Sequence, residues 1–261
     1  MAERADRHKL YQEAVQNVEE EIDFVDERFE AMRGRKAESL REDFCGTANT
    51  ACEWVRRRTT NRAIGVDLDN DVLQWGRENN IGKLDEEAKS RVNLLNEDVL
   101  TVRTEPVDVL LAMNFSYWLF QERTTLLNYF KSVRAALKDD GVFFCDAYGG
   151  WDAHRTITEA RDCERFEYVW DQDEFDPITH RMKCFIHFKF PDGSKMKKAF
   201  SYEWRLWSLP ELRELLAEAG FSKVTIYWEG ADEDGDGNGE FEPVTEAESD
   251  PGWICYLVAE K

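Results

Sequence analysis

Residues 41–54 read REDFCGTANTACEW, and this stretch decides how the surrounding chain folds. It joins a short strand-like run to a helix-like run through the small residues Cys45 to Ala48. Small residues let a backbone approach a ligand, and the first N–H groups of the next helix then point at it. Because a Gly-Thr pair before a helix is also an ordinary helix cap, the neighbouring pattern has to decide between a binding loop and a turn.

The neighbouring chain alternates apolar runs with helical segments. AIGVDL (63–68), VNLL (92–95), VDVLLAM (107–113) and GVFFCDAY (141–148) predict buried strands, and residues 49–58, 69–79 and 122–137 predict the helices between them. This order is typical of an α/β fold with a parallel sheet and helices on both faces. Asp67 ends its strand 21 residues after Gly46, near the ~20-residue interval at which an acid meets a ribose in dinucleotide folds.

The second half of the chain breaks this rhythm. Three strand-like runs, CERFEYVW (163–170), RMKCFIHFKF (181–190) and KMKKAFSYEWRLW (195–207), predict an antiparallel insertion, with PDGS (191–194) as a hairpin turn. A helix over 208–221 and the strands KVTIYW (223–228) and WICYLVA (253–259) follow. At the other end of the chain, NVEEEIDFVDERFEAM (17–32) predicts a helix before the first strand.

The composition is that of a folded acidic protein. The 261 residues are 42% hydrophobic and carry a formal net charge of −20, which argues against nucleic acid or an anionic membrane surface as the main partner. Six cysteines without a CxxC pair, no apolar signal segment and no apolar run of ~20 residues predict a cytoplasmic protein that does not span a membrane. The sequence leaves the oligomeric state open, a homodimer included.

No metal site is predicted. His154, His180 and His187 lack metal-ligand spacing. The run DEDGDGNGEFE (232–242) has Asp232, Asp234 and Asp236 at the alternate positions of a calcium loop, but Pro243 stands where that loop needs its bidentate Glu. This run is therefore expected to be a solvated loop between the last two strands. It lies in the acidic segment 229–250, which has ten acidic and no basic residues and whose role the sequence leaves open.

These motifs together resemble the class I S-adenosylmethionine-dependent methyltransferases over about residues 38–260. The first-strand motif of that family runs acid, apolar, Gly, any, Gly, any, Gly. EDFCGTA (42–48) keeps the acid as Glu42 and the middle glycine as Gly46, while Phe44 and Ala48 replace the first and last glycines. GVDLD (65–69), NEDVL (96–100), DVLLAMNFSYW (108–118) and LKDDGVFFCDAYGG (137–150) are similar to the later motifs.

The resemblance implies a Rossmann-like seven-stranded sheet and S-adenosylmethionine as the cofactor. It implies that Asp67 binds the ribose hydroxyls, with Leu68 against the adenine. Asp98 would bind the adenine amine, for which Glu97 is the alternative. The implied cofactor-binding set is Glu42, Cys45, Gly46, Thr47, Ala48, Asp67, Leu68, Asp98, Val99 and Asn114.

The resemblance also implies a domain organisation. Residues 1–37 would form an N-terminal helical cap, 38–160 and 208–261 the cofactor-binding domain, and 161–207 an inserted antiparallel subdomain. The insertion then follows the fifth strand and lies over the carboxyl edge of the sheet, where ligands of open α/β folds bind.

Acceptor residues are expected at the same edge. Asn114 stands at the tip of the fourth strand, as a binding residue or as a turn former, and FSYWLF (115–120) either lines the pocket or packs in the core. Tyr11 is a candidate lid residue, because an N-terminal segment of such methyltransferases often folds over the cofactor. The candidate acceptor-pocket residues are Tyr11, Asn114, Tyr117, Trp118 and Tyr148.

The predicted function is methyl transfer to a small or medium-sized acceptor. No His is placed as a strong general base, and transfer from a sulfonium needs chiefly alignment, so a nitrogen or sulfur acceptor is favoured. The missing glycines leave an alternative, a non-catalytic module that binds the cofactor as a sensor or scaffold. A nicotinamide-dependent oxidoreductase is disfavoured because the dinucleotide loop needs glycines absent here.

Overall fold

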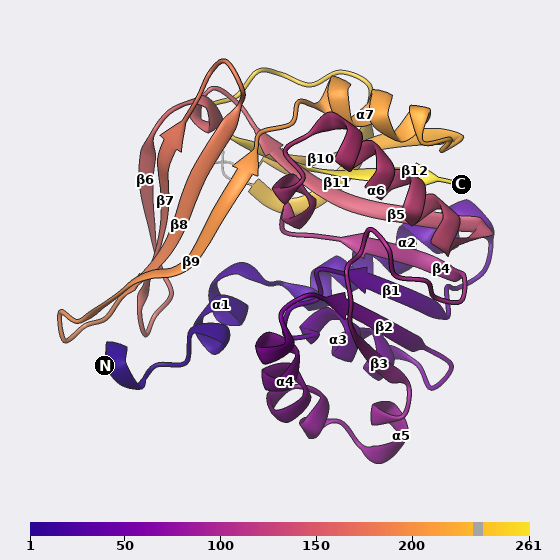
Figure 1. Ribbon diagram of the computed structural model, residues 1–261, viewed down its shortest axis with the longest axis horizontal. Helices are drawn as coiled ribbons and strands as arrows, with labels where there is room; N and C mark the ends of the chain where they lie inside the picture. Colours follow the sequence, from indigo (N-terminus) through magenta and orange to yellow (C-terminus); the bar gives the residue numbers. More distant parts are fainter. Residues whose placement is uncertain (232–236) are drawn as a thin grey trace.

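The protein has a large mixed sheet covered by helices and a smaller second sheet to one side (Figure 1). The structure is a computed structural model, and it describes residues 1–231 and 237–261. The strands are β1 (Ser39–Asp43), β2 (Arg62–Asp67), β3 (Val92–Asn96), β4 (Val107–Ala112), β5 (Leu137–Gly149), β6 (Ile157–Asp162), β7 (Glu167–Phe175), β8 (Arg181–Lys189), β9 (Lys195–Arg205), β10 (Lys223–Ala231), β11 (Gly237–Val244) and β12 (Trp253–Glu260). The helices are α1 (Arg7–Val15), α2 (Val18–Arg33), α3 (Asn49–Arg57), α4 (Asn70–Asn79), α5 (Glu86–Lys89), α6 (Arg123–Ala136) and α7 (Leu209–Glu218), with short 3-10 turns η1 (Ala2–Arg4), η2 (Ile81–Lys83), η3 (Ser116–Leu119) and η4 (Asp152–His154).

The large sheet has the order β11-β10-β12-β5-β4-β1-β2-β3. In the part of the sheet with the order β5-β4-β1-β2-β3, all neighbouring strands pair in parallel. On the other side of β5, the strands β12, β10 and β11 each pair antiparallel with their neighbours. Because side chains alternate along a strand, β4 supplies both faces: Leu110 and Ala112 pack with α6 and α7, while Val109 and Leu111 pack with α2 and α3. The predicted parallel sheet with helices on both faces is confirmed.

Within residues 1–231 and 237–261 this sheet has eight strands, so the predicted number of seven is wrong. The extra strand is β11, which pairs antiparallel with β10 at the edge of the sheet. Phe241 anchors it, because its ring contacts Tyr256 and Phe24 at centroid distances of 4.4 and 5.9 Å. Exposed acidic residues on an edge strand disfavour pairing with other chains. Because acidic residues are also uncommon in strands, the sequence of β11 does not predict a strand.

Part of the acidic segment is therefore strand rather than solvated loop. Gly237–Val244 is ordered as β11, which corrects that expectation. Asp232, Asp234 and Asp236, the residues that gave the segment its likeness to a calcium loop, lie outside the described residues. Within the described ranges no group of His, Cys, Asp or Glu could hold a metal ion.

The insertion forms a separate four-stranded antiparallel sheet of order β6-β7-β8-β9. PDGS makes the turn between β8 and β9, where the Phe190 N–H donates to the Ser194 carbonyl at 3.0 Å and Gly193 has φ +80°. The strand β6 was not predicted, because its side chains are almost all exposed and show no apolar alternation. The inserted sheet thus starts at residue 157, and the expected boundary at 161 cuts through its first strand.

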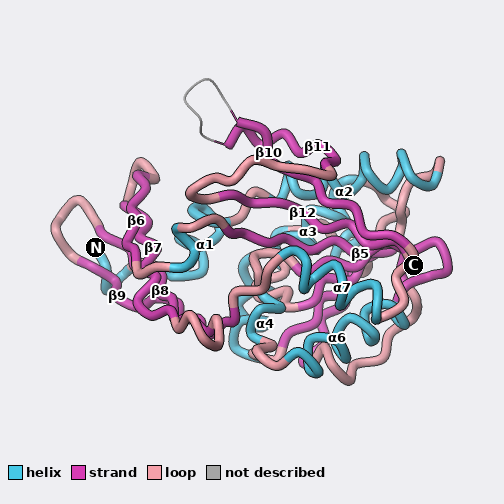
Figure 2. Tube along the Cα trace, turned by 90° about the horizontal axis from the view of Figure 1, so that it is seen from above, coloured by secondary structure: helices cyan, strands magenta, loops and turns pink. Residues whose placement is uncertain are grey.

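The helix α1 lies between this second sheet and the large one (Figures 1 and 2). Leu10 and Ala14 pack against Phe188 and other apolar residues of the insertion. On its other side Gln12 donates from Nε2 to Thr47 Oγ1 at 2.7 Å, in the loop after β1. The N-terminal segment therefore connects the insertion to the predicted cofactor loop.

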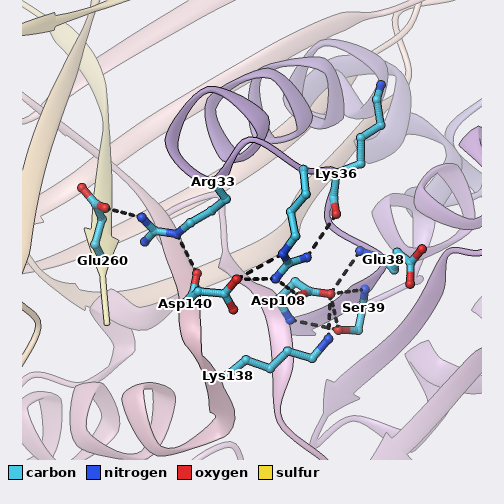
Figure 3. Close-up of polar contacts among 9 residues, drawn as sticks. Arg33, Lys36, Glu38, Ser39, Asp108, Lys138, Asp140 and Glu260 are labelled. Atoms are coloured by element: carbon cyan, nitrogen blue, oxygen red, sulfur yellow. Dashed lines mark hydrogen bonds and ion pairs between the residues drawn. The ribbon is translucent and has the colours of Figure 1, made fainter.

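The amino end of the large sheet is held by the buried Asp108 (Figure 3). Its carboxylate accepts hydrogen bonds from Arg35 Nη2 at 2.7 Å, Lys138 Nζ at 2.9 Å and the Ser39 hydroxyl at 2.7 Å. Burial alone would raise the pKa of Asp108, but these donors outweigh it and hold the pKa well below its ordinary value. This network is structural, since ligands of such sheets bind at the opposite, carboxyl end.

Two further observations concern the chain as a whole. All six cysteines are free thiols. Among the helices of the described residues, none is both long and apolar enough to cross a membrane.

Candidate cofactor and acceptor site

The loop after β1 turns without its usual first glycine. Phe44, Gly46 and Ala48 all have positive φ, of +58°, +51° and +56°. The ring of Phe44 turns back into the core, where it contacts Phe120 and Tyr129 at centroid distances of 5.9 and 5.7 Å. Burial of this ring offsets the strain of a left-handed Phe, so the substitution reshapes the loop and does not fill it.

Gly46 leaves the space in front of the loop open. A Cβ built on Gly46 would meet no atom of the described residues within 4 Å. Its N–H donates to Asp67 Oδ2 at 2.8 Å, so the loop is joined to the end of β2. Asp67 Oδ1 accepts from the Asp69 N–H at 2.9 Å, and each oxygen keeps a lone pair for a further donor. Burial raises the pKa of Asp67.

The helix α4 supports the same loop from behind. A Cβ on Gly76 would lie 2.5 Å from the Thr47 carbonyl oxygen, so only glycine allows this close approach. Asn80 Nδ2 donates to the same oxygen at 2.9 Å. Neither Gly76 nor Asn80 was predicted as a site residue, although a glycine inside a helical pattern was an available signal for Gly76.

The other cofactor candidates lie at the ends of β2 and β3. Leu68 is 69% exposed, which is unusual for a leucine, whereas Val99 is buried in the core. The Asp98 carboxylate accepts the Leu100 N–H at 2.9 Å and so shapes the turn after β3. Asn96 Nδ2 donates to the Leu68 carbonyl at 2.8 Å and holds the two strand ends together. Cys45 and Ala48, in the loop after β1, are buried.

The acid of the first motif is Glu42, whose neighbour Asp43 faces the other side of the sheet. Asp43 is buried with Arg41 Nε at 2.7 Å and the Tyr129 hydroxyl at 3.0 Å, which explains an acid in an apolar slot. Glu42 Oε2 accepts the Ala51 N–H at 3.2 Å, at the start of α3. Burial raises the pKa of Glu42 to about 8, against the opposing effect of the bonds from Thr50 and Ala51.

Two more carboxylates share this part of the molecule. Burial, together with the charges of Asp146 and Glu42, raises the pKa of Glu21, on α2, to about 8. Burial likewise raises the pKa of Asp146 to about 7. Glu21 Oε2 is buried and accepts no hydrogen bond from the described residues. An orphaned buried oxygen close to two other carboxylates fits a positively charged ligand such as S-adenosylmethionine.

Asp146 also shapes the loop after β4. Asn114 and Phe115 have φ values of +57° and +56°, and both of their N–H groups donate to the Asp146 carboxylate, at 2.7 and 2.8 Å. The Tyr117 hydroxyl donates to the Asp146 carbonyl at 2.8 Å. The turn at the carboxyl end of β4 is thus fixed by a residue of β5.

A cavity of about 490 Å³ opens beside this loop, between the large sheet, the insertion and α1. Asn114 and Phe115 form one wall, and Tyr11 enters from the N-terminal helix. The lining residues are Tyr11, Val15, Asn114, Phe115, Tyr148, Gly149, Asp152, Ala153, Ile157, Glu159, Tyr168, Trp170, Gln172, Ile186, Tyr202, Trp204, Glu229, Pro251, Gly252, Trp253 and Ile254.

Three of the five candidate acceptor-pocket residues line the cavity, and two do not. Tyr11, Asn114 and Tyr148 line it. Tyr117 and Trp118 are fully buried and do not line it, so their assignment to the pocket is wrong; the large apolar faces of both rings are used in core packing.

The insertion supplies a wall of the cavity that was not predicted. Tyr168, Trp170 and Gln172 alternate along β7, and Tyr202 and Trp204 alternate along β9, so each set lies on one face of its strand. The alternation of these residues at every second position was a signal in the sequence that they share one face of each strand. Gln172 fixes a neighbouring loop, because its Nε2 donates to the Ala153 carbonyl at 3.1 Å.

Comparison with solved structures identifies the fold. A S-adenosylmethionine-dependent methyltransferase from Clostridium acetobutylicum superposes with a TM-score of 0.70 at 15% identity, over 97% of this chain and 96% of that chain. The fold is that of these methyltransferases. An amino pentose methyltransferase from Micromonospora echinaspora, solved with S-adenosylmethionine bound, gives 0.67 at 14% identity over 97% and 95% of the two chains. A sugar N-methyltransferase from Streptoalloteichus gives 0.64 at 14% over 98% and 93%. No family model matches the chain, and no curated protein matches it in sequence.

Proposed function

We propose that the protein is a S-adenosylmethionine-dependent methyltransferase that methylates a nitrogen, or secondarily a sulfur, of a small or medium-sized acceptor held in the cavity. The observation that carries this proposal is the loop Asn114–Phe115. It ends β4 at the edge where ligands of α/β sheets bind, and it forms a wall of the cavity. One loop would therefore contact the cofactor on one side and the acceptor on the other.

The residues of the chain would divide the work as follows. When bound, the cofactor supplies a methyl group activated by a sulfonium leaving group. Glu42 and Asp67 would hold it on the loop after β1, with Leu68 and Asp98 around its base. Glu21 and Asp146, whose pKa values are raised to about 8 and about 7, would ionise more fully when the cationic end of the cofactor is bound nearby. The helix α1, attached to Thr47 through Gln12, would exclude water, and the aromatic wall would orient the acceptor.

The first test is cofactor binding. We expect S-adenosylhomocysteine to bind one site per chain in calorimetry and to raise the melting temperature, because a ligand selective for the native state stabilises it. NAD serves as the control nucleotide, and it should not bind. Absence of S-adenosylhomocysteine binding at millimolar concentration would end the methyltransferase proposal.

The second test separates the enzyme from a non-catalytic sensor or scaffold. Turnover is read as S-adenosylhomocysteine released from S-adenosylmethionine in the presence of an acceptor panel of amines and thiols. Release that depends on an acceptor supports the enzyme. Cofactor binding without release on any acceptor or cell extract supports the sensor or scaffold.

A further inference from the structure

The cavity has a strongly aromatic wall. Eight of its lining residues are aromatic. On the insertion Trp170, Tyr202 and Trp204 form one continuous patch, with centroid distances of 4.4 Å between Tyr202 and Trp204 and 6.0 Å from Trp170 to each. The faces of such rings carry partial negative charge, so they attract cations as well as apolar groups.

The charged groups of the same cavity are all acidic. Asp152, Glu159 and Glu229 line it, and none of its described lining residues is Lys, Arg or His. Asp152 is neutralised by Arg155, whose Nε lies 2.9 Å from its Oδ1. Glu159 and Glu229 form no ion pair with any described residue, and burial raises the pKa of Glu229, which already accepts the Gly239 N–H at 3.2 Å.

The arginines that flank the cavity already have partners. Arg155 pairs with Asp152, and Arg161 donates to the Ala14 carbonyl of α1 while its guanidinium lies 5.5 Å from the ring centre of Tyr168. A phosphate or carboxylate group in the cavity would therefore find no free bidentate donor and would face two unpaired acids. An ammonium group would find rings and carboxylates.

We infer that the acceptor is an organic amine that enters the cavity as a cation and carries no phosphate or carboxylate group. This inference rests on the proposed function and names its substrate class. The apolar part of the amine would lie on the patch of Trp170, Tyr202 and Trp204, with the ammonium group toward Glu229. Such a preference excludes sugar nucleotides, whose diphosphate the cavity could not pair.

The chemistry of transfer is consistent with this cation-binding wall. The ammonium first loses one proton to solvent. The nitrogen lone pair then forms the N–C bond while the C–S bond breaks and its electron pair stays on sulfur. The positive charge thereby moves from sulfur to nitrogen, and the product is again an ammonium ion. The rings and the carboxylate would stabilise the charge that develops on nitrogen.

The test compares matched probes that differ in charge. Phenethylamine, 2-phenylethanol and 3-phenylpropionate form one set, and choline with its neutral isostere 3,3-dimethyl-1-butanol forms a second. Each is titrated by calorimetry into the full chain saturated with S-adenosylhomocysteine, so that no turnover occurs. In each set in which binding is detected, we expect the cation to bind about tenfold more tightly than its neutral or anionic analogue. A neutral or anionic analogue that binds as tightly as its cation, or no cation binding at about 10 mM, overturns the inference.

Two variants locate the effect. Glu229→Gln and Trp170→Leu should each reduce the preference for the cation at least about threefold, a typical share for one carboxylate or one ring. Glu240→Gln on the same hairpin and the exposed Trp151→Leu lie outside the lining and should leave it unchanged. An unchanged preference in both cavity variants would place the cation elsewhere and overturn the inference.

Failure of this inference and failure of the proposed function give different results. S-adenosylhomocysteine binding in every variant shows that the fold and the cofactor site persist, whatever the probes do. If S-adenosylhomocysteine does not bind the wild-type chain, the proposed function fails, and the inferred substrate class, which rests on it, fails with it.

Discussion

Replacing Gly46 by valine should separate cofactor binding from folding. Gly46 has φ +51°, and a Cβ there would meet no described atom within 4 Å, so the new side chain would enter the open space proposed for the cofactor. A left-handed backbone costs an L-residue roughly 1–2 kcal/mol. For a chain of this size that cost lowers the melting temperature by about 2–8 °C, which leaves the protein folded at room temperature.

Gly34→Val is the matched control. Gly34 has φ +66°, and a Cβ there also meets no described atom within 4 Å. It ends α2, where its N–H donates to the Glu30 carbonyl at 2.8 Å, at the amino end of the sheet. The strain should therefore be similar in the two variants, while only Gly46→Val obstructs the site.

Calorimetry with S-adenosylhomocysteine and thermal unfolding distinguish the two effects. We expect similar melting temperatures for both variants, unchanged affinity for Gly34→Val, and at least tenfold weaker binding for Gly46→Val, about 1.4 kcal/mol. If Gly46→Val binds as Gly34→Val does, the CGTA loop is an ordinary helix cap and the cofactor site lies elsewhere.

Three other substitutions test separate parts of the structure. Asp67→Ala should weaken S-adenosylhomocysteine binding by roughly 1.5–3 kcal/mol in calorimetry, the value of hydrogen bonds to a charged group, and unchanged affinity would exclude Asp67 as a ligand. Asp108→Asn should lower the free energy of unfolding by roughly 1.5–3 kcal/mol at pH 7 in denaturant titrations, because it removes the charge of a buried carboxylate that accepts hydrogen bonds from Arg35 and Lys138. The pKa of Asp108 is lower in the folded than in the unfolded protein, so ionised Asp108 stabilises the fold above the unfolded pKa of about 4. This stabilisation is lost as the pH falls through the folded pKa. Asp108→Asn should therefore lose less stability in acid than the wild type does. For Glu21 the sign is opposite: its pKa is raised from 4.5 to about 8 in the folded state, so the cofactor-free protein should lose stability as the pH rises from about 4.5 to about 8. Glu21→Gln should make that profile flatter, and an equal slope in both proteins would assign the loss to other groups.

The large sheet was predictable because its central strands are buried on both faces. VDVLLAM and GVFFCDAY are nearly continuous apolar runs, which is how strands covered by helices on both sides appear in a sequence. The two strands that escaped prediction are β6 and β11, and both have mostly exposed side chains. Hydrophobic periodicity reports burial, so it cannot detect strands that bury almost nothing.

The site was predictable only where its residues lie close together in the sequence. The loop of Gly46 and the strand end at Asp67 are fixed by neighbours in sequence, and the structure brings them within one hydrogen bond of 2.8 Å. The cavity instead gathers residues from α1, β5, the insertion and the chain before β12. Its aromatic wall depends on how the second sheet is oriented toward the first, and no spacing along the sequence encodes that orientation. Tyr117 and Trp118 were misassigned for the same reason, because aromatic residues after a strand can face either the core or the edge.

Asp146 connects the two parts of the site more closely than any motif suggests. Two consecutive left-handed residues, Asn114 and Phe115, would together cost about 2–4 kcal/mol without support. Two hydrogen bonds from their N–H groups to the Asp146 carboxylate, each worth roughly 1.5–3 kcal/mol when the acceptor is charged, offset that strain. With its pKa raised to about 7, Asp146 is only partly ionised near neutral pH. A cation bound nearby would favour the ionised form, so we expect a positively charged cofactor to strengthen the bonds that hold the Asn114–Phe115 wall in place for the acceptor.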